Sequence, residues 1–202
     1  MAISTIRKRH LRDCARVILE GRGLRVELKA GAGIVPGARL RTFDGAEVRE
    51  VAVRTSLDRE IGFTRHPDGR WTTIPTVDEL VVAVPSADEP SVAEVLGFDR
   101  EVVIDACNAA LAARKSEYPE LSHKAPIFIA LDTSDKGHSP EAASGLKAKA
   151  KWRTSVSLAA VRARKSMSAP PAESFIERVK REFAELNGVD VSKDVVEFKI
   201  IA

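Results

Sequence analysis

Residues 38–56 read ARLRTFDGAEVREVAVRTS, and apolar and polar side chains alternate along most of this stretch. Alternation with a period of two is typical of half-buried β-strands, and the Asp44-Gly45 pair at its centre is a frequent hairpin turn. The stretch therefore predicts two antiparallel strands joined by a tight turn. Residues 77–85, VDELVVAVP, end in an unbroken apolar run that predicts a strand buried on both faces.

The sequence on either side of this block predicts further strands and helices. Alternating or apolar stretches predict strands at 24–30, 59–65, 91–99 and 125–132. Apolar residues at helical spacing predict helices over 4–22 and 100–116. We therefore expect an α/β protein with a mixed central sheet over 38–85, with 81–85 buried and with helices flanking the sheet.

The C-terminal third of the chain differs in composition from the rest. Residues 133–148 lack apolar periodicity and predict a loop, and residues 155–165 fit either a short helix or a strand. Ser174 and Glu177 have the spacing of a capping box, which predicts a final helix. A strand is predicted at 195–202.

These patterns divide the chain into three parts. We expect a core over 1–132, a basic and partly mobile segment with a linker over 133–172, and a C-terminal helix–strand element over 173–202. About 30 residues are too few to fold alone, so the last element is expected to dock on the core, on a second copy of the chain or on a protein partner.

Charge is unevenly distributed along the sequence. Residues 1–25 carry seven Arg or Lys and two acids, and residues 142–172 carry seven Arg or Lys and no acid, although the whole chain has a net charge of only +3. The stretch between them is acidic. This segregation indicates either that the basic segments contact an anionic partner or that solvated basic faces balance the acidic middle.

Composition also bears on membranes and cofactors. No apolar run approaches the roughly 20 residues that span a bilayer, so we expect a cytoplasmic protein without a membrane partner. Cys14 and Cys107 lie among apolar residues on predicted helices, which favours two reduced core thiols over a redox or metal role. No cysteine pair has the spacing of metal ligands, so we expect neither a metal nor another cofactor.

The predicted order of elements over residues 5–115 resembles the core of the PD-(D/E)XK nuclease-like superfamily. The resemblance lies in VILEGRGLRVE (17–27), TFDG (42–45), AVRTS (52–56) and VDELVVAVP (77–85). It implies a restriction-endonuclease-like fold, in which carboxylates on adjacent strands hold Mg²⁺ near a scissile phosphate and a Lys positions or activates water. Many members have an acidic residue or Gln, a spacer and Lys-Thr where this chain has AVRTS.

The resemblance makes Asp44, Glu50 and Arg54 the candidate catalytic residues, although the chain departs from the family pattern. Ala52 stands at the carboxylate position and cannot bind metal, so Glu50 serves only if the site has shifted. Arg54 stands at the Lys position and cannot be a base, because its guanidinium stays protonated. Asp44 fits either a metal ligand or a turn residue. Mg²⁺ is expected as a cofactor only if such a site is active.

Two segments are candidate nucleic-acid contacts. Arg54, Thr55 and Ser56 supply a guanidinium and two hydroxyls, which suit a phosphate, unless Arg54 pairs with a nearby surface acid. In the second segment, 145–155, alternating cations lie on one face if the chain is extended, with a tryptophan to stack on a base. These residues are Lys147, Lys149, Lys151, Trp152 and Arg153. The alternative there is a solvated basic linker.

Three functions therefore remain open. The first is a nucleic-acid-associated protein on a degenerate nuclease-like scaffold that binds DNA or RNA backbone without sequence specificity. The second is a protein-interaction or regulatory accessory subunit, and the third is a Mg²⁺-dependent nuclease with a migrated carboxylate. We favour the first, because the strand order, the AVRTS segment and the basic flanks all support it.

Overall fold

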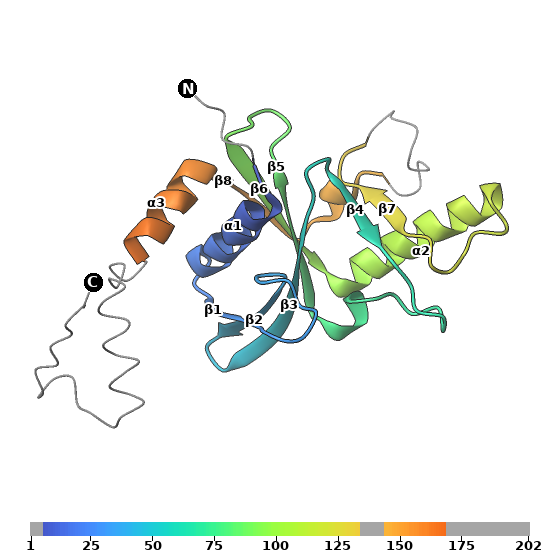
Figure 1. The fold of residues 1–202 in the computed structure, drawn as a ribbon, viewed down its shortest axis with the longest axis horizontal. Helices are drawn as coiled ribbons and strands as arrows, with labels where there is room; N and C mark the ends of the chain where they lie inside the picture. Colours follow the sequence, from blue (N-terminus) through green and yellow to red (C-terminus); the bar gives the residue numbers. More distant parts are fainter. Residues whose placement is uncertain (1–5, 134–143, 169–202) are drawn as a thin grey trace, which may run out of the picture. The chain divides into compact units, whose positions relative to one another are not determined.

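The computed structural model describes residues 6–133 and 144–168 (Figure 1). The chain divides into two units, Met1–Val161 and Arg162–Ala202, and the two β-sheets found among the described residues lie in the first unit. The expected helix–strand element at 173–202 and most of the expected loop at 133–148 lie outside the described residues.

A mixed six-stranded sheet forms the centre of the first unit. Strands β3 and β5 are parallel, and every other neighbouring pair in the sheet is antiparallel. The spatial order is β1 (Arg25–Leu28), β2 (Arg39–Asp44), β3 (Glu47–Thr55), β5 (Glu79–Pro85), β6 (Val92–Asp99) and β8 (Trp152–Ser157). The α/β class and the mixed sheet predicted from the sequence are confirmed.

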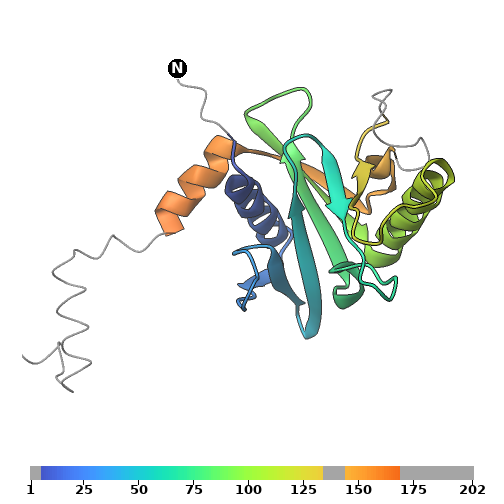
Figure 2. The same ribbon diagram turned by 45° about the vertical axis from the view of Figure 1, so that its right-hand side comes forward.

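Two helices cover opposite faces of this sheet (Figures 1 and 2). Helix α1 (Lys8–Gly21) packs with the inward side chains of β3 and β5 on one face, and α2 (Arg100–Glu117) covers the other face. Residues 80–84 are fully buried because side chains alternate between these two hydrophobic layers. The two-sided burial predicted for this strand is therefore confirmed, except that Pro85 is only partly buried.

The predicted strand at 59–65 does not join the central sheet. Strand β4 (Glu60–Phe63) instead pairs antiparallel with β7 (Ile127–Ala130) in a separate two-stranded sheet. The expectation that all of 38–85 builds one sheet is thus wrong. The physical reason is that Ile61 and Phe63 bury their side chains in the hydrophobic layer beside α2, which alternation alone does not distinguish from a place in the central sheet.

Residues 144–161 belong to the same unit as the central sheet, although their composition predicts a basic segment after the core. The short 3₁₀ helix η3 (Leu146–Lys149) leads into β8, which pairs with β6 along the sheet edge. Helix α3 (Leu158–Ser168) follows, and its Leu158 and Val161 are buried in the layer beside α1. The segment 155–165, left open between helix and strand, therefore changes from strand to helix after Ser157.

Arg59 links the ends of the two sheets through four contacts. Its guanidinium donates to both carboxylate oxygens of Asp132 (2.5 and 3.0 Å), to Glu94 of β6 (2.8 Å) and to the carbonyl of Pro85 (2.6 Å). Lys147 adds an ion pair to Glu94 at 2.6 Å. Arg59 itself adopts a left-handed φ of +64°, which is uncommon for a residue with a side chain. These contacts hold the chain where it leaves β3 for β4.

Three further features concern the cysteines, Trp71 and membranes. Cys14 and Cys107 are buried and are not joined to each other by a disulfide, as expected of core thiols. Trp71 is also buried, and its Nε1 donates to Asn108 Oδ1 at 2.9 Å, so it is a packing residue. No helix in the described part of the chain has both the length and the apolar character to cross a membrane.

Candidate anion-binding site

The three candidate catalytic residues do not converge. Glu50 and Arg54 alternate along β3 with Val51 and Val53, whose side chains lie in the layer beside α1, so Glu50 and Arg54 point to the opposite face. Asp44 follows Thr42 along β2 and lines a cavity on the α1 side. The sheet therefore separates Asp44 from the other two residues.

Glu50 is already neutralised by two cations. Its carboxylate accepts from Lys29 Nζ at 3.0 Å and from Arg41 Nη2 at 2.9 Å, and these contacts lower its pKa despite partial burial. Among residues 6–133 and 144–168, no group of three or more His, Cys, Asp or Glu side chains is placed to hold a metal ion. The residues present thus do not fit the Mg²⁺ site that the nuclease resemblance implies.

Arg54 lies half-buried beside the hydrophobic layer under α2. Its Nη2 donates to Thr73 Oγ1 at 3.1 Å, and its guanidinium carbon lies 5.6 Å from the centroid of the Phe63 ring. Its Nε is buried without a hydrogen-bond partner in the described part of the protein. Burial is the main reason why the pKa of Arg54 falls below its usual value, and the charge of Arg39 is the second. The alternative of a surface ion pair with Asp58 or Glu60 is not observed.

Arg39 approaches Arg54 from the neighbouring strand. It pairs in register with Ala52 of β3, so its side chain extends on the same face as that of Arg54. Its Nη2 donates to Thr76 Oγ1 at 3.0 Å. Burial lowers the pKa of Arg39, and attraction to Glu50 opposes this effect only in part. Neither Arg39 nor Arg54 forms an ion pair with any described carboxylate.

The two threonines belong to one strained turn. Thr73 adopts φ +76° and ψ −51°, which costs a β-branched residue about 1–3 kcal/mol. The turn is held by a bond from Ile74 N to Thr72 O (2.9 Å) and by the 3₁₀ helix η1 (Ile74–Thr76), in which Thr76 Oγ1 donates to Thr73 O at 2.8 Å. This turn thus presents two hydroxyls to two guanidinium groups. We refer to Arg39, Arg54, Thr73 and Thr76 as the arginine-pair site.

The hydroxyls predicted to accompany Arg54 are not the ones at this site. Ser56 is buried and donates its hydroxyl proton to Asp58, and Thr55 is the next residue along β3, so it faces the other side of the sheet. Thr73 and Thr76 take their place, and sequence reasoning did not identify them. Their only signal is the polar pair within TTIPT after a buried tryptophan, which does not indicate contact with β3.

The alternating cations of 147–153 do not form one extended face. Lys147 and Lys149 lie in η3, whereas Lys151 and Arg153 lie before and within β8. Lys147 pairs with Glu94 at 2.6 Å and Lys151 with Asp99 at 2.8 Å. Lys149 and Arg153 are exposed. The predicted strip is therefore interrupted by the 3₁₀ turn and by ion pairs.

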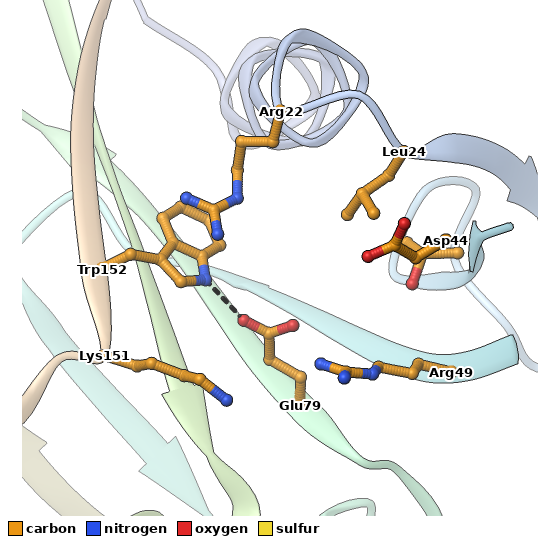
Figure 3. A pocket seen from close by; sticks show the side chains of 8 residues that line it. Arg22, Leu24, Asp44, Arg49, Glu79, Lys151 and Trp152 are labelled. Atoms are coloured by element: carbon orange, nitrogen blue, oxygen red, sulfur yellow. Dashed lines mark hydrogen bonds between the residues drawn. The ribbon is translucent and has the colours of Figure 1, made fainter. Parts of the chain in front are cut away.

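Trp152 attaches β8 to the sheet. Its ring lies across Gly97 of β6. The guanidinium carbon of Arg22 lies 4.4 Å from the ring centroid, and the Nε1 of Trp152 donates to Glu79 Oε1 at 2.6 Å (Figure 3). Because Gly97 and Arg22 cover the ring, it is not placed to stack on a base.

A cavity of about 140 Å³ lies beside this ring. Figure 3 shows Arg49, Lys151 and Asp44 around its rim. Arg49 pairs with Glu47 at 2.7 Å and Lys151 with Asp99 at 2.8 Å, so two of the rim cations are already balanced. Two residues of the lining, Glu79 and Arg22, contact Trp152 and so help to hold β8 against the sheet.

We expect Gly97→Ala to lower the free energy of unfolding by about 1–3 kcal/mol, the usual cost of overpacking. A Cβ at this position would lie only 2.1 Å from Cε2 of Trp152. Urea unfolding of both single variants and the Gly97→Ala/Trp152→Leu double variant measures the coupling. Gly97→Ala should lower the free energy of unfolding much less when Trp152 is already replaced by Leu. If the effects of the two substitutions simply add, position 97 and Trp152 are not in contact.

Comparison with known proteins leaves the family open. Neither a family model nor a curated protein matches this chain. The crystal structure of MepB shares similarity at 13% sequence identity and a TM-score of 0.25, over 41% of this chain and 59% of MepB. The chain therefore spans less than two thirds of that protein, and a likeness at this level carries no argument about fold or function. The resemblance to the PD-(D/E)XK superfamily stays a prediction.

Proposed function

We propose that the protein binds the phosphate groups of DNA or RNA through the arginine-pair site. The observation that supports this function is the pair of adjacent guanidinium groups, Arg39 and Arg54, that contact threonine hydroxyls and no described carboxylate. A desolvated cation without a partner costs several kcal/mol, and an anion offsets that cost. Phosphate matches the planar donor fork of arginine and attracts both charges.

The surrounding strands favour an extended polyanion as the ligand. Arg25, Lys29 and Arg41 lie on or beside the same face of β1–β3, next to Glu27 and Glu50. Two acids pair with these three cations, so one outer charge remains unbalanced in addition to the two charges of Arg39 and Arg54. Recognition through phosphates carries no base information, so binding should be independent of sequence.

We expect Arg39→Gln to weaken binding of a labelled oligonucleotide about 10-fold or more at low salt, because a charge-assisted hydrogen bond contributes about 1.5–3 kcal/mol. The slope of log K against log salt should also flatten by about 0.7–0.9, the equivalent of one phosphate contact. Fluorescence anisotropy with single-stranded DNA, duplex DNA and RNA measures both quantities. The turn should remain intact, because it is held by the bonds from Ile74 N to Thr72 O and from Thr76 Oγ1 to Thr73 O.

Two matched variants control this experiment. Arg70→Gln removes the same charge at an exposed turn residue that pairs with Asp68, and it should leave affinity nearly unchanged. Arg153→Gln tests the basic segment on β8. Loss of affinity in Arg153→Gln but not in Arg39→Gln would move the contact to β8 and contradict the proposal. If no oligonucleotide binds at about 50 mM salt, where phosphate contacts are strong, the accessory-subunit function replaces it.

A further inference from the structure

The arginine-pair site carries more positive charge than one internal phosphate neutralises. Arg39 and Arg54 contribute two charges, and no described carboxylate pairs with either. The buried thiol of Cys107 interacts with Arg54, but burial raises the pKa of this thiol to about 12, so it stays neutral and balances neither charge. A phosphodiester in a strand has one negative charge, whereas a phosphate monoester carries about −1.5 to −2 at pH 7.

The site also has more hydrogen-bond donors than the two free oxygens of a phosphodiester can readily accept from. Arg39 and Arg54 each use Nη2 toward a threonine, which leaves further N–H groups of both side chains. Thr73 Oγ1 accepts from Arg54, and its own proton has no acceptor in the described part of the chain. Three terminal oxygens of a monoester can use such donors, while a diester offers only two unesterified oxygens.

Apolar and buried residues cover one side of the site. Arg54 is half-buried against Phe63, and the turn that holds Thr73 and Thr76 is anchored by the buried residues Trp71 and Ile74. An internal phosphate brings a sugar on each side and needs an open groove. A phosphate at a strand end has only one substituent, so its three free oxygens can face Arg39 and Arg54 while the strand leads away from the covered side.

Resting on the nucleic-acid function proposed above, we infer that the arginine-pair site takes the terminal phosphate monoester of a DNA or RNA strand. Arg54 forms the floor of the site, Arg39 closes it from β2, and the Thr73 hydroxyl completes it. The other cations of the β1–β3 face then contact the adjoining backbone. The protein is thereby a strand-end binder.

The test compares oligonucleotides of one sequence with a 5′-phosphate, a 3′-phosphate or hydroxyl ends, together with a circular single strand that has no end. We expect one phosphorylated end to bind about 10-fold or more tightly than hydroxyl ends and circles, as one or more charge-assisted hydrogen bonds provide. Arg39→Gln and Arg54→Gln should remove this preference, and Arg70→Gln should retain it. Inorganic phosphate should raise the melting temperature of the wild type more than that of Arg39→Gln.

The outcomes separate the inference from the function on which it rests. Equal binding of all ends and of the circle, with loss in Arg39→Gln, would overturn the strand-end ligand and leave backbone binding at the site intact. A phosphate preference that survives in both arginine variants would place the end-binding site elsewhere and overturn the inference. Stabilisation by inorganic phosphate without binding of any oligonucleotide would overturn both.

Discussion

Replacing Arg59 by Met is expected to lower the free energy of unfolding by about 3 kcal/mol, the lower end of the range for breaking a buried ion pair. The guanidinium meets two oxygens of Asp132, one of Glu94 and the carbonyl of Pro85. The side chains of Arg59 and Glu94 are only 14% and 11% exposed, so water replaces little of what is lost. Asp132 is 40% exposed, which limits the total.

Two controls distinguish this loss from a general effect of removing charge. Arg70→Met deletes an exposed ion pair with Asp68 and should change stability by no more than about 0.5 kcal/mol. Arg59→Lys retains the charge but not the planar fork, so it should recover only part of the loss. Chemical unfolding in urea gives all three values. Equal effects of Arg59→Met and Arg70→Met would show that the network does not hold the sheets together.

The same network predicts how stability depends on pH. The hydrogen bond from Arg59 lowers the pKa of Asp132. Burial by itself would raise the pKa of Glu94, but the hydrogen bonds from Lys147 and Arg59 outweigh burial, so the pKa of Glu94 is lowered as well. A carboxyl group whose pKa is lower in the folded than in the unfolded state stabilises the fold at pH values above its unfolded-state pKa, near 4. This stabilisation is lost as the pH falls through the folded-state pKa. The difference in free energy of unfolding between the wild type and Arg59→Met should therefore become smaller below about pH 4. If this difference in free energy stays constant down to about pH 2.5, then Asp132 and Glu94 are not the groups through which Arg59 stabilises the fold.

Arg54→Met is expected to raise the stability of the ligand-free protein by about 1–2 kcal/mol, in line with the gain from replacing buried charges by apolar side chains of similar volume. The guanidinium has one described hydrogen bond, a buried Nε without a partner and a like charge beside it. A methionine would pack against Phe63 without these costs. Binding of phosphate and nucleic acid should be lost at the same time.

The experiment measures melting temperature with and without inorganic phosphate. Phosphate should stabilise the wild type but not Arg54→Met. The difference in melting temperature between the two proteins should therefore become smaller or change sign as phosphate is added. Arg70→Met, which removes an exposed arginine paired with Asp68, should change neither value much. A marked destabilisation by Arg54→Met in phosphate-free buffer would show that Arg54 is a structural residue instead of an anion ligand.

Local patterns were enough to predict most strands. Alternation over 38–56 became the hairpin of β2 and β3, with Asp44 and Glu47 paired beside the turn. The turn uses Gly45 at φ +56°, which suits glycine. The apolar run of 81–84 became a strand buried on both faces. These features were predictable because each depends on neighbours within a few residues.

The partners of these elements were not predictable from the same patterns. Strand β4 alternates like a strand of the central sheet, yet its partner is β7, more than 60 residues further along the chain. The basic stretch before β8 was expected to be a linker, but Trp152 lies over Gly97 and carries the chain back to the sheet edge. Pairing depends on which surfaces remain to be buried, and that is a property of the whole fold.

The site shows the same division. The sequence by itself determined that Arg54 and Glu50 share a strand face, since they stand four residues apart on β3. Only the tertiary structure brought Arg39 beside Arg54, placed the strained turn of Thr73 over both, and left Asp44 on the opposite side of the sheet. Strand alternation is set by the backbone over a few residues, whereas contact between β2, β3 and a turn after β4 is set by long-range burial of the hydrophobic layers.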